Sequence, residues 1–230
     1  MGDAAHGRRY RLITFDVYSA LFDIAGSLVP VVRDELESIA DAAGFVRVWR
    51  SKQLEYTLIS NSLGGPHVPF RIATERALDY TLKRADCAAS AATKTHLTRA
   101  WDELRPWPEA DEVLGSVKAR GYPIAMLSNG DVAMLNALRA QFSTPFDHVF
   151  ACEQASRYKP HPDVYELPLK ALNLNADEIL HVAGGATDVI GARHAGLHCG
   201  WSNRHQDFLI DPGVRADFEW NDLRGLLTIL

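Results

Sequence analysis

The sequence of 230 residues predicts an α/β fold, in which a doubly wound, mostly parallel sheet carries an inserted helical cap. The first observation is that short apolar runs, typical of buried strands, alternate with stretches of helical periodicity. The strand-like runs are residues 12–15, 123–127 and 179–183, with weaker ones at 148–150, 198–201 and 217–220. The helical patterns between them are residues 111–120, 132–142, 163–172 and 189–195. This alternation predicts parallel strands that are covered by helices on both faces.

The second observation is a long segment, residues 24–105, that contains no convincing strand. It shows helical periodicity in four stretches, which are residues 30–43, 46–62, 69–84 and 88–103. A segment of this length is too long to be a simple crossover helix between two strands. We therefore predict a core domain formed by residues 1–23 and 106–230, and a helical-bundle cap formed by residues 24–105. The chain should re-enter the core near the proline-rich residues 105–108, because proline interrupts regular structure.

Composition and charge limit the partners that the protein is expected to have. A net charge of -5 gives no general attraction to nucleic acids or anionic membranes, so neither is expected as a partner. The cysteines Cys87, Cys152 and Cys199 are scattered and odd in number, which suits a reduced compartment better than a disulfide framework. No apolar run is long enough to span a bilayer. We therefore expect a cytoplasmic protein that binds a small molecule.

Polar side chains stand at four places where a predicted strand ends or a helix begins. Asp16 follows the first strand, and Ser128 and Asn129 end the strand at 123–127. Lys159 lies in a proline-rich loop before a helix, and Asp188 follows a glycine pair after the strand at 179–183. In a doubly wound sheet these loops meet at the carboxyl edge, where ligands bind. An aspartate, small polar donors, a lysine and a second acid form a plausible set for covalent catalysis, although Ser128, Asn129 and Asp188 also suit simple helix capping.

The order and spacing of these residues resemble the haloacid dehalogenase superfamily. Its four motifs are an aspartate nucleophile, a serine or threonine, a lysine and a terminal acid. Within this superfamily the chain is similar to the type II (S)-2-haloacid dehalogenases. Three segments carry that narrower resemblance: FDVY at 15–18 with LFD at 21–23, LSNG at 127–130, and the cap segment WRSKQLEYT at 49–57.

The resemblance implies a two-step reaction in which Asp16 is the nucleophile. Asp16 would attack C2 of a short 2-haloalkanoic acid and displace the halide toward Arg50 and the Asn129 amide. Water would then hydrolyse the Asp16 ester, with Lys159 and Asp188 orienting it and supporting the developing charge. Relatives of this type are commonly dimers, so a homodimer is possible.

The resemblance also implies how the substrate is held. The carboxylate of the substrate would be bound by the Ser128 hydroxyl, by backbone amides near Tyr18 and Ser19, and by Lys159. The candidates for the wall of the pocket are Tyr18, Leu54, Phe70 and Tyr165.

The residues near Asp16 and Asp188 disfavour a Mg²⁺-dependent phosphatase of the same superfamily. Such a phosphatase protonates its leaving alkoxide from an acid two residues after the nucleophile, whereas this position is Tyr18, and a phenol has a pKa of about 10. The usually acidic position four residues before Asp188 is Gly184, which offers no oxygen ligand for Mg²⁺. We therefore expect no metal and no cofactor. Five histidines lack the spacing of metal ligands and are predicted to be surface or loop residues: His161, His181, His194, His198 and His205.

Some positions depart from the pattern of the type II enzymes. Ser19 and Ala20 stand where the family usually has glycine and threonine, and Ala183 and Gly185 replace a usual serine and asparagine. Fewer hydrogen-bonding side chains should make the site roomier. The alternatives that stay open are another carbon electrophile, such as azetidine-2-carboxylate, a Mg²⁺-dependent phosphatase, and a non-catalytic relative.

Overall fold

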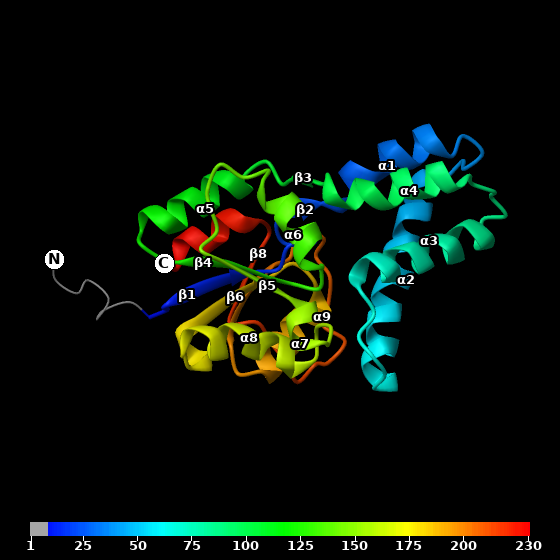
Figure 1. The fold of residues 1–230 in the computed structure, drawn as a ribbon. Coiled ribbons are helices and arrows are strands. Elements are labelled where there is room, and N and C mark those ends of the chain that lie inside the picture. Colours follow the sequence, from blue (N-terminus) through cyan, green and yellow to red (C-terminus); the bar gives the residue numbers. More distant parts are fainter. Residues whose placement is uncertain (1–8) are drawn as a thin grey trace.

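Residues 9–230 are described by a computed structural model, in which a sheet-based core carries a helical body at one end (Figure 1). Within these residues the core sheet has six parallel strands, in the order β5-β4-β1-β6-β7-β8. The strands are β1 Leu12–Phe15, β4 Ile124–Ser128, β5 His148–Ala151, β6 Ile179–Ala183, β7 His198–Ser202 and β8 Phe218–Trp220. The predicted α/β fold class is therefore confirmed.

Strand β1 lies at the centre of the sheet, between β4 and β6. All four of its residues are buried, as expected for a parallel strand that is covered on both faces. The chain places β4 and β5 on one side of β1 and β6, β7 and β8 on the other, so the strand order reverses there. Ligands of open α/β sheets bind beyond the carboxyl ends of the strands at such a reversal. Asp16, the residue after β1, stands at this point.

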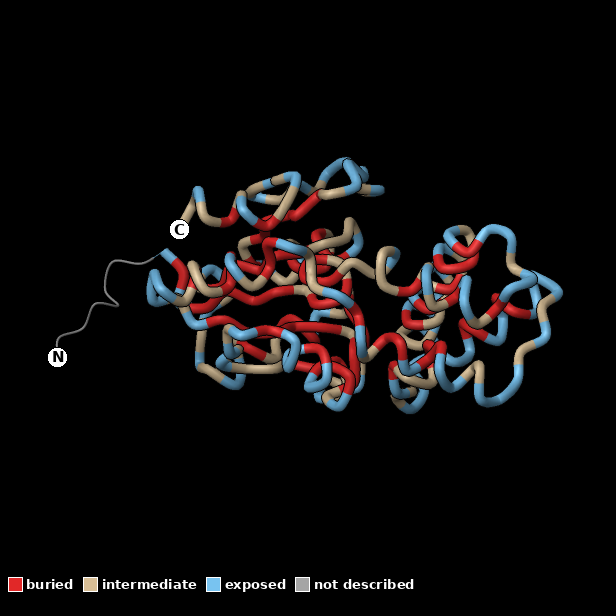
Figure 2. Tube along the Cα trace, turned by 90° about the horizontal axis from the view of Figure 1, so that it is seen from above, coloured by how far each residue is buried: buried red, intermediate tan, exposed pale blue. Residues whose placement is uncertain are grey.

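Helices cover both faces of the core sheet. The helix α5, Ala110–Ala119, packs with the 3₁₀ helix η3, Leu223–Thr228, on one face. The opposite face is covered by α7 Cys152–Ala155, α8 Pro162–Leu172 and α9 Ala186–His194 (Figure 1). The helix α6, Val132–Arg139, follows β4. Figure 2 shows that buried residues concentrate along the strands and on the inner sides of the helices.

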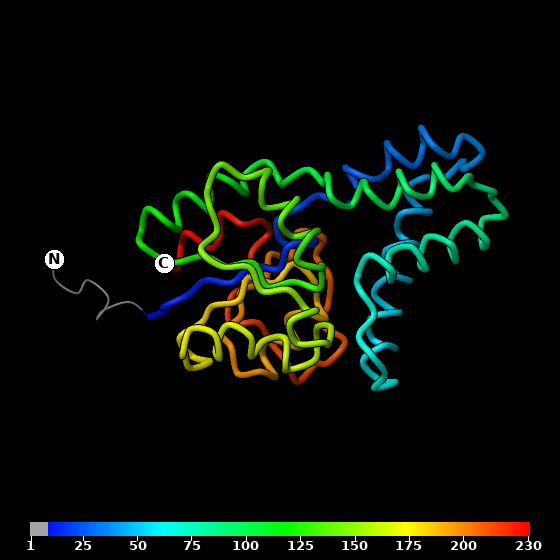
Figure 3. Tube along the Cα trace, viewed as in Figure 1, coloured from blue at the N-terminus to red at the C-terminus, as the bar shows by residue number. Residues whose placement is uncertain are grey.

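The segment between β2 and β3 forms the helical body. It consists of α1 Ile24–Glu35, α2 Ala42–Leu63, α3 Phe70–Arg84, α4 Ala91–Arg99 and the 3₁₀ helix η1 Ala100–Asp102. The chain passes to this body and back through a two-stranded antiparallel ribbon, β2 Phe22–Asp23 with β3 Arg105–Pro106 (Figure 3). We propose this ribbon as the boundary between core and cap, since the predicted limits at 23–24 and 105–106 fall within it. None of the described helices is both long and apolar enough to cross a membrane.

The prediction of a first cap helix at 30–43 is wrong. The helix α1 begins at Ile24, because the Asp23 side chain accepts a hydrogen bond from the Gly26 N–H at 2.8 Å and caps it directly after β2. Pro30 therefore lies inside α1, and Asp41 caps the next helix by accepting from the Gly44 N–H at 2.7 Å. The predicted helix at 88–103 is divided into α4 and η1.

Candidate active site

A cavity of about 230 Å³ lies between the carboxyl end of the sheet and the cap helix α2. Most of the predicted site residues line it: Asp16, Tyr18, Ser19, Arg50, Leu54, Asn129, Lys159 and Asp188. They come from the loop after β1, from α2, from the end of β4, from the loop before α8, and from the start of α9. The reversal of strand order at β1 thus brings segments that are distant in sequence to one site.

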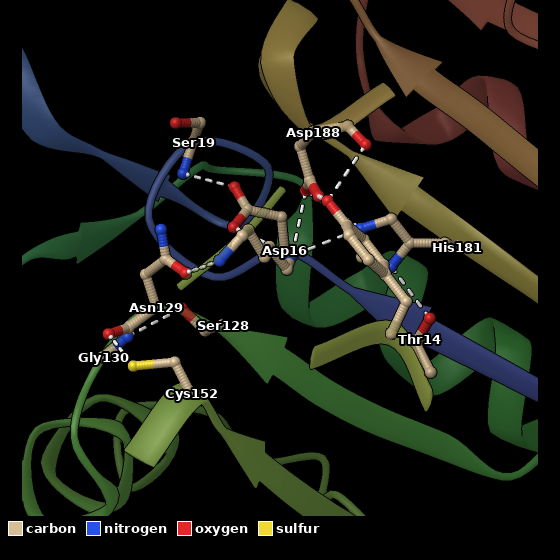
Figure 4. A network of polar contacts seen from close by, with 11 residues as sticks. Thr14, Asp16, Ser19, Ser128, Asn129, Gly130, Cys152, His181 and Asp188 are labelled. Carbon is tan, nitrogen blue, oxygen red and sulfur yellow. Dashed lines mark hydrogen bonds and ion pairs between the residues drawn. The ribbon is translucent and has the colours of Figure 1, made fainter. Parts of the chain in front are cut away.

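Asp16 has a nearly buried carboxylate, with 13% of its side chain exposed. Its Oδ2 accepts a hydrogen bond from the Ser19 N–H at 3.0 Å, and its Oδ1 lies 3.6 Å from the Lys159 ammonium (Figure 4). The loop that holds Asp16 packs closely on the loop after β6. A Cβ atom added at Gly184 would lie 2.2 Å from the Ala20 nitrogen, so only glycine fits there. The contact fixes the backbone of the nucleophile.

Lys159 is positioned through both its backbone and its side chain. Its N–H donates to Asn129 Oδ1 at 2.7 Å, which leaves the Asn129 NH₂ group as the donor available to a ligand. The side chain is 5% exposed, and its ammonium donates to Asp188 Oδ2 at 3.0 Å. The lysine therefore lies between the two carboxylates of the site, Asp16 and Asp188.

Arg50 places a guanidinium group in the cavity from the cap. Its Nη1 donates to Gln53 Oε1, and Gln53, which is fully buried, donates in turn to Thr74 Oγ1 at 2.6 Å. The guanidinium also lies over the rings of Tyr18 and Trp101, 5.6 and 5.7 Å from their centroids. Burial lowers the pKa of Arg50, and the negative charge of Asp16 opposes this shift. These contacts hold the Arg50 guanidinium in the cavity that Asp16 also lines.

Asp188, in the first turn of α9, is surrounded by hydrogen-bond donors. Oδ2 accepts from Lys159 at 3.0 Å and from His181 Nε2 at 2.9 Å, and Oδ1 accepts from the Tyr165 hydroxyl at 2.7 Å. Burial raises the pKa of Asp188, but the charge of Lys159 and the contact with His181 outweigh it, so this pKa lies well below its usual range. Asp188 is therefore a carboxylate at neutral pH.

The prediction that His181 is a surface or loop residue is wrong. His181 is fully buried in the middle of β6, where its Nδ1 lies 2.8 Å from Thr14 Oγ1 on β1 (Figure 4). The position of His181 within an apolar run was the sequence signal for its burial, because a strand buried on both faces has no exposed side chains. Among the other histidines, His194 and His205 are exposed, whereas His161 and His198 are partly buried.

Three predicted substrate-binding residues do not line the cavity. Phe70 is buried and packs on the Tyr18 ring at 5.3 Å, and Tyr165 is buried behind Asp188. Ser128 is also buried, and its hydroxyl accepts from the Gly130 N–H at 3.4 Å. Phe70 and Tyr165 thus support Tyr18 and Asp188, which do line the cavity.

Several further residues at or behind the cavity were not predicted as site residues, although Gln53 and Thr57 lie within the cap segment 49–57. Thr57, Leu58 and Asp207 line the cavity, while Gln53 and Trp101 hold Arg50 from behind. The periodicity of α2 indicates which residues share a face, but it does not indicate which face meets the core. Asp207 lies in an irregular loop after β7, where no pattern predicts direction.

Comparison with known proteins agrees with this geometry. A family model for haloacid dehalogenase-like hydrolases matches residues 10–196. The chain is 34% identical to the (S)-2-haloacid dehalogenase of Pseudomonas sp. (strain YL) over 219 residues, which are 94% of this chain and 93% of that protein. The chain therefore belongs to the haloacid dehalogenase-like hydrolase family, as the resemblance of its motifs predicts.

Solved structures show the same fold over nearly the whole chain. The L-2-haloacid dehalogenase RSc1362 has a TM-score of 0.90 and 28% identity, with 96% of this chain and 98% of that chain covered. The L-2-haloacid dehalogenase of Xanthobacter autotrophicus with chloropropionic acid covalently bound has a TM-score of 0.84 and 25% identity, with the same coverage.

Proposed function

We propose that this chain hydrolyses short (S)-2-haloalkanoic acids to 2-hydroxy acids through an ester on Asp16, without a metal ion. The observation that carries the proposal is that the Asp16 carboxylate and the Arg50 guanidinium line one small cavity. The names of the relatives support this activity, and so does the chloropropionic acid covalently bound to the Xanthobacter protein.

The first step forms a bond between an Asp16 oxygen and C2 of the substrate. The bond from C2 to the halogen breaks at the same time, and the halide leaves with both electrons toward Arg50 and the Asn129 NH₂ group. A halide needs no proton in order to leave, but it needs positive charge and hydrogen-bond donors. The substrate carboxylate would pair with the Lys159 ammonium and with backbone amides near Ser19. Leu54 on the cavity wall helps to exclude water, which strengthens these interactions.

The second step hydrolyses the ester at its carbonyl carbon. Water adds to the Asp16 carbonyl, the bond from that carbon to the alkoxide breaks, and the alkoxide takes up the proton that the water gave. The 2-hydroxy acid leaves, and the Asp16 carboxyl returns a proton to solvent. The Lys159 ammonium lies where it would stabilise the negative charge on the carbonyl oxygen.

The donor set fits a phosphatase less well. The Lys159 ammonium already pairs with both carboxylates of the site, at 3.6 Å from Asp16 and 3.0 Å from Asp188. Gly184 offers no side-chain oxygen, and Tyr18 is a poor acid because burial raises its pKa well above the usual value. A Mg²⁺-bound reaction would therefore need a different arrangement of these residues.

Halide release from (S)- and (R)-2-chloropropionate tests the proposal directly. We expect chloride release from the (S) enantiomer by the wild-type protein, and none by Asp16→Asn, whose amide is a poor nucleophile. Ring opening of azetidine-2-carboxylate and Mg²⁺-dependent hydrolysis of p-nitrophenyl phosphate should be measured in parallel. Activity on one of those compounds, with no chloride release from any 2-haloacid, would overturn the proposal.

We also propose that the protein forms a homodimer in the cytoplasm. The proposed interface is the outer face of α2, where Ile59 and Leu63 are exposed although apolar. Unpaired cysteines in the described chain suit a reducing compartment. Light scattering of Leu63→Glu beside the wild type tests the interface, and an unchanged dimer mass would contradict it.

A further inference from the structure

His181 is a buried polar residue to which the mechanism above assigns no role. It sits on β6 with β1 on one side and β7 on the other, and none of its surface is exposed. Its two ring nitrogens contact three groups: Thr14 Oγ1 at 2.8 Å, Asp188 Oδ2 at 2.9 Å and Lys159 Nζ at 3.3 Å (Figure 4). A buried group with this many polar contacts calls for an explanation.

The contacts determine which ring nitrogen carries a proton. A carboxylate oxygen only accepts, so the 2.9 Å contact with Asp188 requires a proton on His181 Nε2. In the neutral ring Nδ1 then accepts the proton of the Thr14 hydroxyl. The Lys159 ammonium is also only a donor, so Lys159 and His181 are two donors that converge on Asp188 Oδ2 rather than partners of each other.

These contacts form a path that starts on β1 and ends at the residue that follows it. Thr14 lies in β1, and Asp16 directly follows the last residue of this strand. The path runs from Thr14 through His181 and Asp188 to Lys159, and it returns to Asp16 across 3.6 Å. The position of the ammonium relative to the nucleophile therefore depends on the anchoring of Asp188.

The two chemical steps depend on this anchoring to different extents. While Asp16 is a carboxylate, its own charge attracts Lys159. Once Asp16 is an ester it is neutral, so among the described protein residues Asp188 is the carboxylate that still pairs with the ammonium, beside the carboxylate of the bound substrate. This is the stage at which negative charge grows on the Asp16 carbonyl oxygen and the ammonium is needed there.

We infer that His181 is a positioning residue that holds Asp188, and through it Lys159, for hydrolysis of the Asp16 ester. The predicted effect on ester hydrolysis rests on the proposed function. The predicted position of Lys159 does not depend on it. Loss of His181 should slow hydrolysis of the ester much more than its formation.

Three substitutions distinguish the effect of the hydrogen bond that His181 donates to Asp188 from the effect of the volume that its ring fills. The amide nitrogen of His181→Gln reaches the place of Nε2 and can still donate to Asp188, whereas that of His181→Asn reaches only the place of Nδ1. His181→Phe fills the space and donates nothing. We expect the Asn and Phe variants to lose about 10- to 100-fold in kcat and to accumulate ester on Asp16, seen by intact-protein mass spectrometry during turnover. The Gln variant should stay close to the wild type.

Three results would overturn the inference. One is an equal loss in the Gln and Asn variants, and another is ester formation that slows in parallel with turnover while no ester accumulates. The third is structural and needs no substrate. In a crystal structure of Asp16→Asn, whose neutral side chain stands in for the ester, Lys159 should stay on Asp188, and it should leave Asp188 when His181→Phe is added. If Lys159 keeps its place in the double variant, His181 does not position it, whatever the reaction. If no halide is released but Lys159 moves as expected in the double variant, only the proposed function is refuted.

Discussion

Replacement of Gly184 by alanine should displace the nucleophile Asp16 indirectly, through the loop that holds it. The added methyl group would lie 2.2 Å from the Ala20 nitrogen and 2.3 Å from the Ser19 carbonyl carbon. Ordinary contact begins at 3.4 Å, so one of the two loops must move by about 1.2 Å (3.4 Å less 2.2 Å). Ser19 donates the hydrogen bond that fixes Asp16 Oδ2, so the carboxylate moves with its loop. A misplacement of about 1 Å typically costs about 100-fold in rate.

The assay is the rate of chloride release from (S)-2-chloropropionate, with the free energy of unfolding measured by urea in parallel. Gly184→Ala should lower kcat by about 100-fold and stability by about 1–3 kcal/mol, the usual cost of overpacking. The matched control is Gly185→Ala, because a Cβ atom there meets no other atom within 4 Å. The control should change the unfolding free energy very little. Wild-type activity and stability in Gly184→Ala would refute the close approach of the two loops.

Two further changes test the charges of the site. Arg50→Met should slow formation of the Asp16 ester by about 100- to 1,000-fold in single-turnover experiments, because it removes the cation that receives the halide; ester formation at the wild-type rate would show that Arg50 has no such role. Asp188→Asn should alter the dependence of stability on pH. The pKa of Asp188 is lower in the folded protein than the value of about 3.9 in an unfolded chain, so its ion pair stabilises the fold above about pH 4 and this contribution is lost as the pH falls below that value. Urea unfolding between pH 6 and pH 3 should therefore show a smaller loss of stability in Asp188→Asn than in the wild type, and equal slopes would contradict the shifted pKa.

The sequence was most informative about the core. The apolar runs that became β1, β4 and β6 are buried on both faces, and such strands leave a continuous apolar pattern. Polar residues directly after them could be assigned to one edge of the sheet because parallel strands end together. The position of α1 was harder to predict, because Asp23 both ends β2 and caps the helix, and Pro30 suggested a start rather than an interior position.

Contacts between distant segments could not be read from spacing. His181 and Thr14 are 167 residues apart in sequence, and their pairing follows from the register of β6 against β1. The support of Arg50 by Trp101 likewise depends on how the cap helices pack, which a hydrophobic period does not determine. Ser128 and Tyr165 show the opposite case: the resemblance implied that both contact the substrate, whereas both are buried and neither lines the cavity.

The central claim is that Asp16, and not water, makes the new bond to carbon. A single turnover in H₂¹⁸O, with enzyme in excess over (S)-2-chloropropionate, tests it most directly. The account predicts that the new hydroxyl of the lactate carries ordinary oxygen from Asp16, while peptide mass spectrometry finds ¹⁸O in the Asp16 carboxylate. Labelled lactate with an unlabelled Asp16 peptide would contradict it.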